Sequence, residues 1–286
     1  MGSAVVRELI RSGYQVLGLA RTEAAARSLI AAGTEVHMGD LDDPESLQRG
    51  AQAADGVIHT AFNHDFSKFK ENCDTDRRFI EAIGSVLAGS GRPFIVTSAM
   101  GMLPPGRATE KTMPVFRPAG NPRADSEKAV DLLAAKGVLA SIIRLAPSVH
   151  GEGDHGFVPT LINIAREKGV SAYIGQGLNR WPAVHRLDAA RLYRLILEKG
   201  AAGMRYHAAA EEGIPFREIA EAIGRGLNVP AVSLTPEEAA GHFGWFASFA
   251  AMDITAASLQ TRELTGWEPA QDGLIADLNG KSYFGD

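Results

Sequence analysis

The sequence predicts an α/β protein: a doubly wound parallel sheet with helices on both faces, followed by a smaller C-terminal domain. Short apolar strands alternate with helices through the first two-thirds of the chain, an order typical of parallel sheets covered on both sides. With 286 residues, 45% of them apolar, the chain can bury a substantial core and has room for two domains. Beyond Pro147 the alternation loosens, which marks the start of the second domain.

The first elements are a helix and a short strand. Apolar residues recur at helical spacing over residues 2–10, Gly13 ends that helix, and residues 15–20 (QVLGLA) form a buried strand that ends at Arg21. The same alternation then predicts helices at 23–32, 45–53, 69–87 and 124–136, and strands at 35–38, 56–61, 94–98 and 139–145.

The last third of the chain is less regular. Helices are predicted near 158–168, 188–198 and 216–227, with a strand at 204–208. We expect a first domain over 1–150, joined by 184–210, and a substrate domain built from 151–183 and 211–286. The second domain would cover the carboxyl ends of the strands, where open α/β sheets hold ligands.

Composition excludes several classes of partner. The net charge is −5 and basic residues form no block, which argues against nucleic acid. The single cysteine, Cys73, excludes an intrachain disulfide and fits a reducing, cytoplasmic compartment. The most apolar window, 243–252, is about half the length needed to span a bilayer roughly 30 Å thick, so no membrane partner is expected.

Six short motifs follow one another in a characteristic order. They are Gly2-Ser3, Gly39-Asp40-Leu41, VIHTA at 57–61, Asn72 with Thr75, RLAPSVHG at 144–151, and TGWEP at 265–269. Together they resemble the extended and atypical short-chain dehydrogenases/reductases, the superfamily of NAD-dependent epimerases, dehydratases and 3β-hydroxysteroid-dehydrogenase-like proteins. The resemblance covers nearly the whole chain and implies a Rossmann domain that binds a nicotinamide dinucleotide.

The resemblance also implies which residues hold the cofactor. Gly2 would be the last glycine of the TGxxGxxG turn, and Asp40 would contact adenine. The full implied set is Gly2, Arg21, Asp40, Leu41, Thr60, Ala61, Phe62, Asn72, Thr97, Lys128 and Pro147.

The family's first strand and most of its glycine-rich turn are missing from this chain. That strand is central, so its absence leaves two strand edges unpaired and removes two of three glycines near the pyrophosphate. We expect the reading frame to begin late, with about ten further residues upstream encoding a strand and T-G-x-x-G.

Arg21 bears on the choice of cofactor. In such folds an acidic residue at the end of the second strand binds the ribose 2′-hydroxyl of NAD, whereas a basic residue accepts the 2′-phosphate of NADP. Arg21 stands there, so NADP is favoured and NAD remains open. The alternative is that Arg21 is a solvated strand end.

The catalytic pattern of the family is broken. Its members use a Tyr-x-x-x-Lys pair, in which tyrosine exchanges a proton as hydride moves. If Lys128 is the lysine, the tyrosine position is Ala124, which has no proton to give. Lys128 can equally be an ordinary solvated residue, an interpretation that the absence of a preceding tyrosine favours.

Other side chains are candidates for the chemistry. The family's catalytic hydroxyl falls at or just after Ser98, which would donate to substrate or merely satisfy backbone at a strand end. His150, which replaces tyrosine in the family's VYG, and His64, in the loop after the fourth strand, can exchange protons near neutrality; for each, a structural role is the alternative. The HGEGDH run at 150–155 lacks zinc-like spacing, so no metal is expected.

The leading hypothesis is an NADP-dependent oxidoreductase acting on a small, fairly apolar carbonyl or alcohol without the usual pair. The pocket wall would come from Phe157, Trp181, Phe243, Trp245 and Phe246, although such aromatics also form ordinary core. The alternatives are a non-catalytic NADP-binding redox sensor and a ligand-free remnant. The apolar faces of helices 69–87 and 124–136 resemble a pair through which relatives dimerise, so a homodimer is also an expectation.

Overall fold

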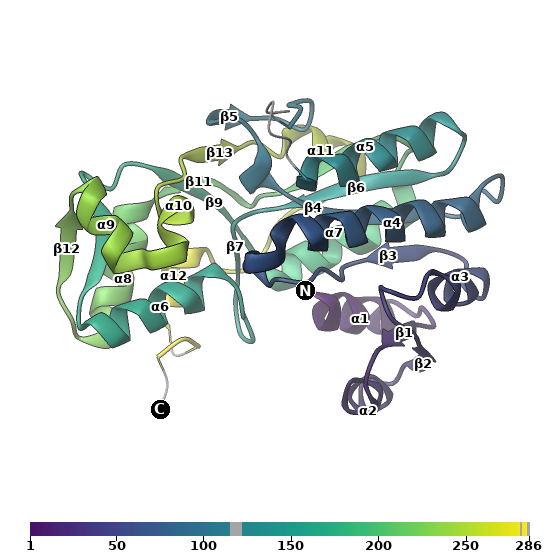
Figure 1. Cartoon of the computed structure of the whole chain (residues 1–286), viewed down its shortest axis with the longest axis horizontal. Coiled ribbons are helices and arrows are strands. Elements are labelled where there is room, and N and C mark those ends of the chain that lie inside the picture. Colours follow the sequence, from purple (N-terminus) through teal and green to yellow (C-terminus); the bar gives the residue numbers. More distant parts are fainter. Residues whose placement is uncertain (115–121, 281, 285–286) are drawn as a thin grey trace.

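A parallel four-stranded sheet forms the centre of the computed structural model, which describes residues 1–114, 122–280 and 282–284. Its spatial order is β10 (Arg205–Ala208), β6 (Ala140–Leu145), β4 (Phe94–Ala99) and β3 (Val57–His59). Each neighbouring pair is parallel, so all four carboxyl ends lie at one edge. The predicted α/β class with a parallel sheet is therefore confirmed (Figure 1).

Alternating side chains of this sheet enter two separate apolar cores. Phe94 and Val96 of β4 pack with α4 (Phe69–Leu87) and α5 (Pro122–Ala135). Ile95 faces the other way, toward α1 (Gly2–Arg11) and α7 (Arg186–Lys199). Because successive strand residues point to opposite faces, this burial shows helices covering both sides of the sheet, as the apolar strands predict.

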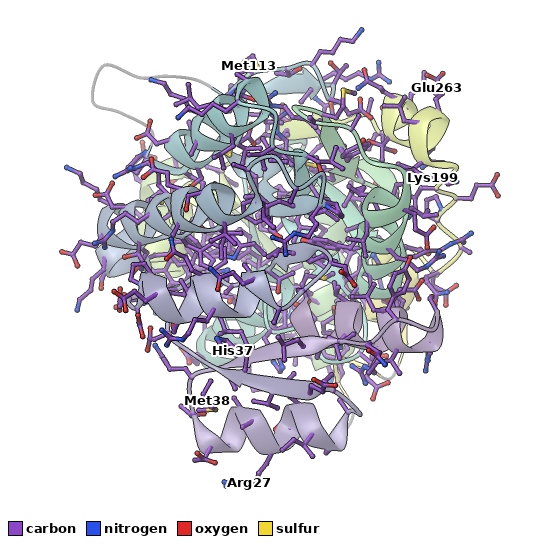
Figure 2. The ribbon with its side chains drawn as sticks, turned by 90° about the vertical axis from the view of Figure 1, so that its right-hand side faces the viewer. Arg27, His37, Met38, Met113, Lys199 and Glu263 are labelled. Atoms are coloured by element: carbon purple, nitrogen blue, oxygen red, sulfur yellow. The ribbon has the colours of Figure 1, made fainter. Side chains whose placement is uncertain are left out.

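A second parallel pair lies at one end of the molecule. It consists of β1 (Leu17–Ala20) and β2 (Glu35–Met38), with α2 (Glu23–Ala31) beside it and α3 (Pro44–Gln52) after it. The turned view in Figure 2 shows this end, with His37 and Met38 of β2 above Arg27 of α2. Within the described ranges no strand joins β1 to β3, so the two parallel sheets remain separate.

The later part of the chain builds a third apolar core, at the left of Figure 1. A three-stranded sheet of β7 (Ser148–His150), β9 (Arg180–His185) and β11 (Glu211–Pro215) leads into it. The pair β8 (Ser171–Ile174) and β12 (Ala231–Leu234) lies farther out. The helices here are α6 (Phe157–Lys168), α8 (Phe216–Leu227), α9 (Pro236–Phe243), α10 (Ala247–Ala250) and α12 (Leu274–Asn279).

The remaining elements are short. The pair β5 (Gly106–Ala108) and β13 (Ile254–Ala256) stands near α11 (Leu259–Thr265), and single turns lie at η1 (Phe66–Lys68), η2 (Met100–Met102) and η3 (Gly244–Phe246). The sequence did not predict β5, β7–β9 or β11–β13; in several of them Gly, Pro or charged residues interrupt the apolar pattern, as in GRA of β5, RWPAVH of β9 and EEGIP of β11. No described helix is long and apolar enough to cross a membrane.

A tight contact at Gly84 sets how closely α4 approaches α5. A Cβ at this position would lie 2.3 Å from the methyl carbons of Leu133, a distance at which the Leu133 side chain or one of the two helices must shift. Gly241, on the exposed side of α9, has no neighbouring atom within 4 Å of the same position.

We therefore expect Gly84→Ala to lower the free energy of unfolding by about 1–3 kcal/mol, because it overpacks the interface. The matched change Gly241→Ala should raise it by roughly 0.5–1 kcal/mol, because alanine restricts the unfolded chain without a clash. Urea titration followed by circular dichroism measures both. Equal effects of the two substitutions would contradict this account of the α4–α5 contact.

Candidate functional site

The ends of β1 and β2 bring Arg21 and Asp40 together. The two strands are parallel and in register, so the residues that follow them meet at one edge. The Nε of Arg21 lies 3.9 Å from Oδ2 of Asp40, and the arginine side chain is 73% exposed. An ion pair so exposed adds little stability. The guanidinium is therefore available to an anion from solvent, and Leu41 lies half-buried beside it.

The first turn of α1 lies against the residue that follows β3. A Cβ at Gly2 would come within 3.1 Å of the Thr60 hydroxyl, so glycine keeps the helix N-terminus close to the strand end. Arg186, at the start of α7, donates from Nη2 to the Ser3 hydroxyl at 3.2 Å. A helix N-terminus with an arginine beside it attracts anions.

Predicted cofactor residues along β3 and β4 also gather at this edge. Thr97 donates to the carbonyl of His59 at 2.5 Å, and its hydroxyl lies 2.6 Å from that of Tyr193. Asn72 donates to the carbonyl of Asp65 at 2.8 Å and so fixes the loop after β3. Ala61 is exposed in that loop, and Pro147 is half-buried where β6 passes into β7.

The inward-facing polar residues of α5 lie one position before the predicted pair, Ala124 and Lys128. The buried polar positions are Arg123, Ser126 and Glu127, whereas Lys128 lies on the exposed side. Ala124 is fully buried and small. The pair at four-residue spacing that faces the sheet is therefore arginine and glutamate.

Sequence reasoning missed this arginine–glutamate pair, although a signal was present. Val130 and Leu133 mark the inward face of the predicted helix, and Arg123, Ser126 and Glu127 lie on that face at helical spacing.

Glu127 holds one buried polar network together. It accepts hydrogen bonds from Ser98 at 2.8 Å, from Arg144 at 2.8 and 2.7 Å, and from Arg205 at 3.1 Å. Burial alone would raise the pKa of this carboxyl, but the bond and charge of Arg144 outweigh it and hold the pKa below its usual value. The hydroxyl of Ser98 is thus buried and donates its hydrogen bond to Glu127.

Asp76 of α4 holds a second network, which sequence reasoning did not identify. Its side chain is 2% exposed and accepts from His59 at 2.7 Å, and from Arg123 and Ser126 at 2.5 Å each. Burial favours the neutral acid, but the His59 hydrogen bond and the Arg123 charge prevail, so the pKa of Asp76 is lowered. Arg123 also donates to the carbonyl of Thr97 at 2.7 Å.

The two predicted histidines lie in contrasting surroundings. His150 is fully buried; its Nδ1 lies 2.5 Å from Oδ2 of Asp277, and its Nε2 has no hydrogen-bond partner among the described residues. His64 is exposed in the loop after β3, with its ring 5.4 Å from that of Phe62. Only His64 lies open to a ligand from solvent.

Aromatic side chains from distant segments meet beside this loop. Phe66 of η1 stacks on Trp245 at 5.4 Å and contacts Phe249 of α10 at 5.4 Å. Trp245 is 60% exposed, whereas four residues predicted with it lie deeper: Trp181, Phe243 and Phe246 are buried and Phe157 is half-buried. Of the predicted wall only Trp245 is exposed, and the half-buried Phe66, which was not predicted with it, packs against it.

Within the part of the chain that the structure describes, no cluster of three or more His, Cys, Asp or Glu residues could hold a metal ion.

Comparison with known proteins gives consistent matches. The model of the NAD dependent epimerase/dehydratase family matches residues 1–209. An uncharacterized protein of Schizosaccharomyces pombe is 50% identical over 285 residues, covering 99% of this chain and 96% of that protein. Sterol-4-alpha-carboxylate 3-dehydrogenase, decarboxylating, of Dictyostelium discoideum is 28% identical over 236 residues, covering 76% of this chain and 70% of that enzyme.

Solved structures show the same fold. The dTDP-glucose 4,6-dehydratase of Streptomyces venezuelae, crystallised with NAD and TYD, superposes with a TM-score of 0.75 at 19% identity. The alignment covers 99% of this chain and 92% of that chain.

The buried ring of His207, in β10, should make the free energy of unfolding depend on pH. Its ring lies 3.3 Å from Nη1 of Arg144 and 2.8 Å from the carbonyl of Ala257. Burial, followed by the charge of Arg144, lowers the pKa of His207 from 6.5 to about 4. Between pH 6.5 and about 4, His207 therefore stays neutral in the folded protein and becomes protonated in the unfolded chain.

The contribution of His207 to the free energy of unfolding should be fully present above pH 6.5. It should decline as pH falls toward 4, because the unfolded state binds the extra proton. Urea unfolding at pH 7, 6 and 5 measures this slope. His207→Gln should be less stable at pH 7 but show a shallower decline between pH 7 and 5. An unchanged slope in the variant would exclude His207 as the cause.

Proposed function

The chain belongs to the NAD dependent epimerase/dehydratase family, and we propose that it is an NADP-dependent oxidoreductase interconverting a carbonyl and an alcohol on a small, apolar substrate. The observation that carries this proposal is the exposed guanidinium of Arg21 beside Asp40, at the end of β1. A 2′-phosphate needs such a cation, whereas the acid that would bind the 2′-hydroxyl of NAD is absent from that position.

Several of the residues present match contacts that a dinucleotide needs. Gly2 lets the first turn of α1 approach Thr60, because a Cβ there would lie 3.1 Å from the threonine hydroxyl, and the N-terminus of α1 would hold the pyrophosphate. Asp40 and Leu41 would contact adenine, and Arg21 the 2′-phosphate. Thr60, Ala61, Phe62, Asn72, Thr97 and Pro147 would line the nicotinamide end, where the bound cofactor supplies or accepts a hydride.

His64 is the histidine that we assign to proton exchange. It is exposed beside Phe62 and Phe66, whereas His150 is enclosed and paired with Asp277. Crowding of the His64 ring by neighbouring atoms, together with the charge of Arg123, lowers its pKa below 6.5. We assign no catalytic role to Lys128, because it lies on the exposed side of α5.

The apolar substrate is supported by the exposed Trp245, which stacks on the half-buried Phe66, and by the relative that is a sterol-4-alpha-carboxylate dehydrogenase. The alternative function is a non-catalytic, NADP-binding redox sensor, which the alanine at position 124 favours. Both functions require NADPH binding, and only the enzyme oxidises NADPH when a carbonyl compound is added.

Charge reversal at Arg21 tests the cofactor assignment. Arg21→Glu should weaken NADPH binding by about 10–100-fold, because a charge-assisted hydrogen bond contributes roughly 1.5–3 kcal/mol. NADH binding should strengthen, because the new carboxylate can bind the ribose 2′-hydroxyl. Isothermal titration calorimetry with each cofactor measures both.

The matched control is Arg27→Glu. Arg27 is exposed on the neighbouring α2 (Figure 2), so the same change in net charge should leave the NADPH affinity nearly unaltered. Equal losses at Arg21 and Arg27 would show a general charge effect and would refute the assignment.

Replacement of His64 tests the proton donor. His64→Asn should lower kcat for carbonyl reduction by about 10²–10⁴-fold, the usual contribution of a general acid. In the wild type, kcat for reduction should fall as pH rises through the lowered pKa of His64, because only the imidazolium donates. Steady-state rates from pH 5 to 8 measure this fall of kcat with pH. If the same fall persists in His64→Asn, His64 is not the proton donor.

A further inference from the structure

We propose that Arg123 holds and polarises the reacting oxygen of the substrate, in place of the tyrosine that is absent at Ala124, and that Asp76 positions it. This inference rests on the proposed oxidoreductase function and adds the group that bears the developing charge.

Arg123 stands where the strand ends converge. It lies in the first turn of α5, and its guanidinium donates to the carbonyl of Thr97 near the carboxyl end of β4. The guanidinium carbon lies 4.2 Å above the ring of Phe62, in the loop after β3. These contacts place a fixed positive charge at the edge of the sheet where open α/β folds bind ligands.

Hydrogen bonds to the described residues use only part of the donor capacity of the guanidinium. It carries five N–H groups in a planar fork, and among the described residues the bonds to Asp76 and Thr97 use one from each Nη atom. Its side chain is 10% exposed, so a small part of it reaches solvent. Such a group can bind one oxygen without changing its own position.

Asp76 explains why this charge is tolerated and how it is oriented. Its Oδ1 accepts from His59 of β3, and its Oδ2 accepts from Arg123 and from Ser126. Both carboxylate oxygens are thus used by neighbours on β3 and α5. A buried carboxylate held in this way keeps its partner charged and fixes the direction of the fork.

The reaction balances with these groups. Bound NADPH would supply a hydride that forms a C–H bond at the carbonyl carbon, and the C=O π pair would move to the oxygen. Arg123 stabilises that oxygen by charge and hydrogen bonding, and the imidazolium of His64 protonates it and is re-protonated by water. The guanidinium is a permanent cation, so it replaces the electrostatic part of tyrosine's role and not the proton transfer.

The neighbouring aromatic rings define the substrate class. Phe62 covers the guanidinium, and the Phe66–Trp245 stack lies in the same region of the molecule. A planar, apolar carbonyl compound matches rings on one side and a cation on the other. Benzaldehyde is therefore a suitable test substrate, and benzoate is its anionic analogue.

Kinetics of three variants test the role with NADPH and benzaldehyde. Arg123→Gln should lower kcat by about 10²–10³-fold, the usual cost of one oxyanion donor, with an unchanged NADPH affinity. Arg123→Lys should recover part of the rate. Millimolar guanidine hydrochloride should partly rescue Arg123→Ala, which a purely structural role would not predict.

Two further variants separate position from folding. Asp76→Asn should lower kcat while the affinity for NADPH is kept, and its pH profile should retain the fall of kcat that His64 causes. Arg92→Gln is the matched control: Arg92 also donates to buried carbonyls, those of Ala51 and Ala54, but it precedes β4 at the opposite edge of the sheet. It should change thermal stability without changing kcat.

Benzoate binding gives a readout that needs no turnover. Titration followed by tryptophan fluorescence should show binding to the wild type and at least ~10-fold weaker binding to Arg123→Gln, as expected for loss of a charge-assisted bond. If the wild type binds benzoate through Arg123 but does not oxidise NADPH, the oxidoreductase function fails and the anion site stands. Equal benzoate affinity in Arg123→Gln, or no binding to the wild type, overturns the inference.

Discussion

The buried carboxylate of Asp76 is the constraint on which the site depends. A charge in the interior must be compensated by partners within hydrogen-bonding distance, and Asp76 finds them on β3 and α5 through His59, Arg123 and Ser126. Since these partners come from different elements, satisfying one carboxylate fixes the rotation of α5 against the sheet. That rotation turns Arg123 and Glu127 inward and leaves Lys128 outside.

Glu127 extends this arrangement across the sheet. Its bonds to Arg144 of β6 and Arg205 of β10 join α5 to two strands, and the bond from Ser98 joins it to β4. Breaking such a buried network at one member leaves an uncompensated charge, so its members hold one another in place. The rigid layer below contrasts with the loop after β3, where His64 and Ala61 are exposed. A buried scaffold that holds Arg123, next to an exposed loop that carries His64, is the arrangement in which functional residues are commonly found.

The fold followed from the sequence in most of its parts, but the candidate site did so only in part. Apolar strands and amphipathic helices predicted the parallel sheet, because burial on both faces leaves a period and a composition that a single sequence displays. The encounter of Arg21 with Asp40 was also predictable, since residues that follow parallel strands share an edge. The one-residue shift on α5 was not identified, although the spacing from Val130 contained it. The contact between His150 and Asp277 could not be predicted from the sequence, because the two residues lie far apart in the chain.

By itself the sequence determined the α/β class, the family resemblance and the absence of a Tyr-x-x-x-Lys motif, because each depends on local order and residue identity. Only the tertiary structure decided which charged side chains are buried together. Asp76, Arg123 and Glu127 are ordinary polar residues in the sequence and become a site only when β3, α4 and α5 pack. The physical reason is desolvation: its cost appears when elements close over a charge, and only the partners brought by the fold can offset it.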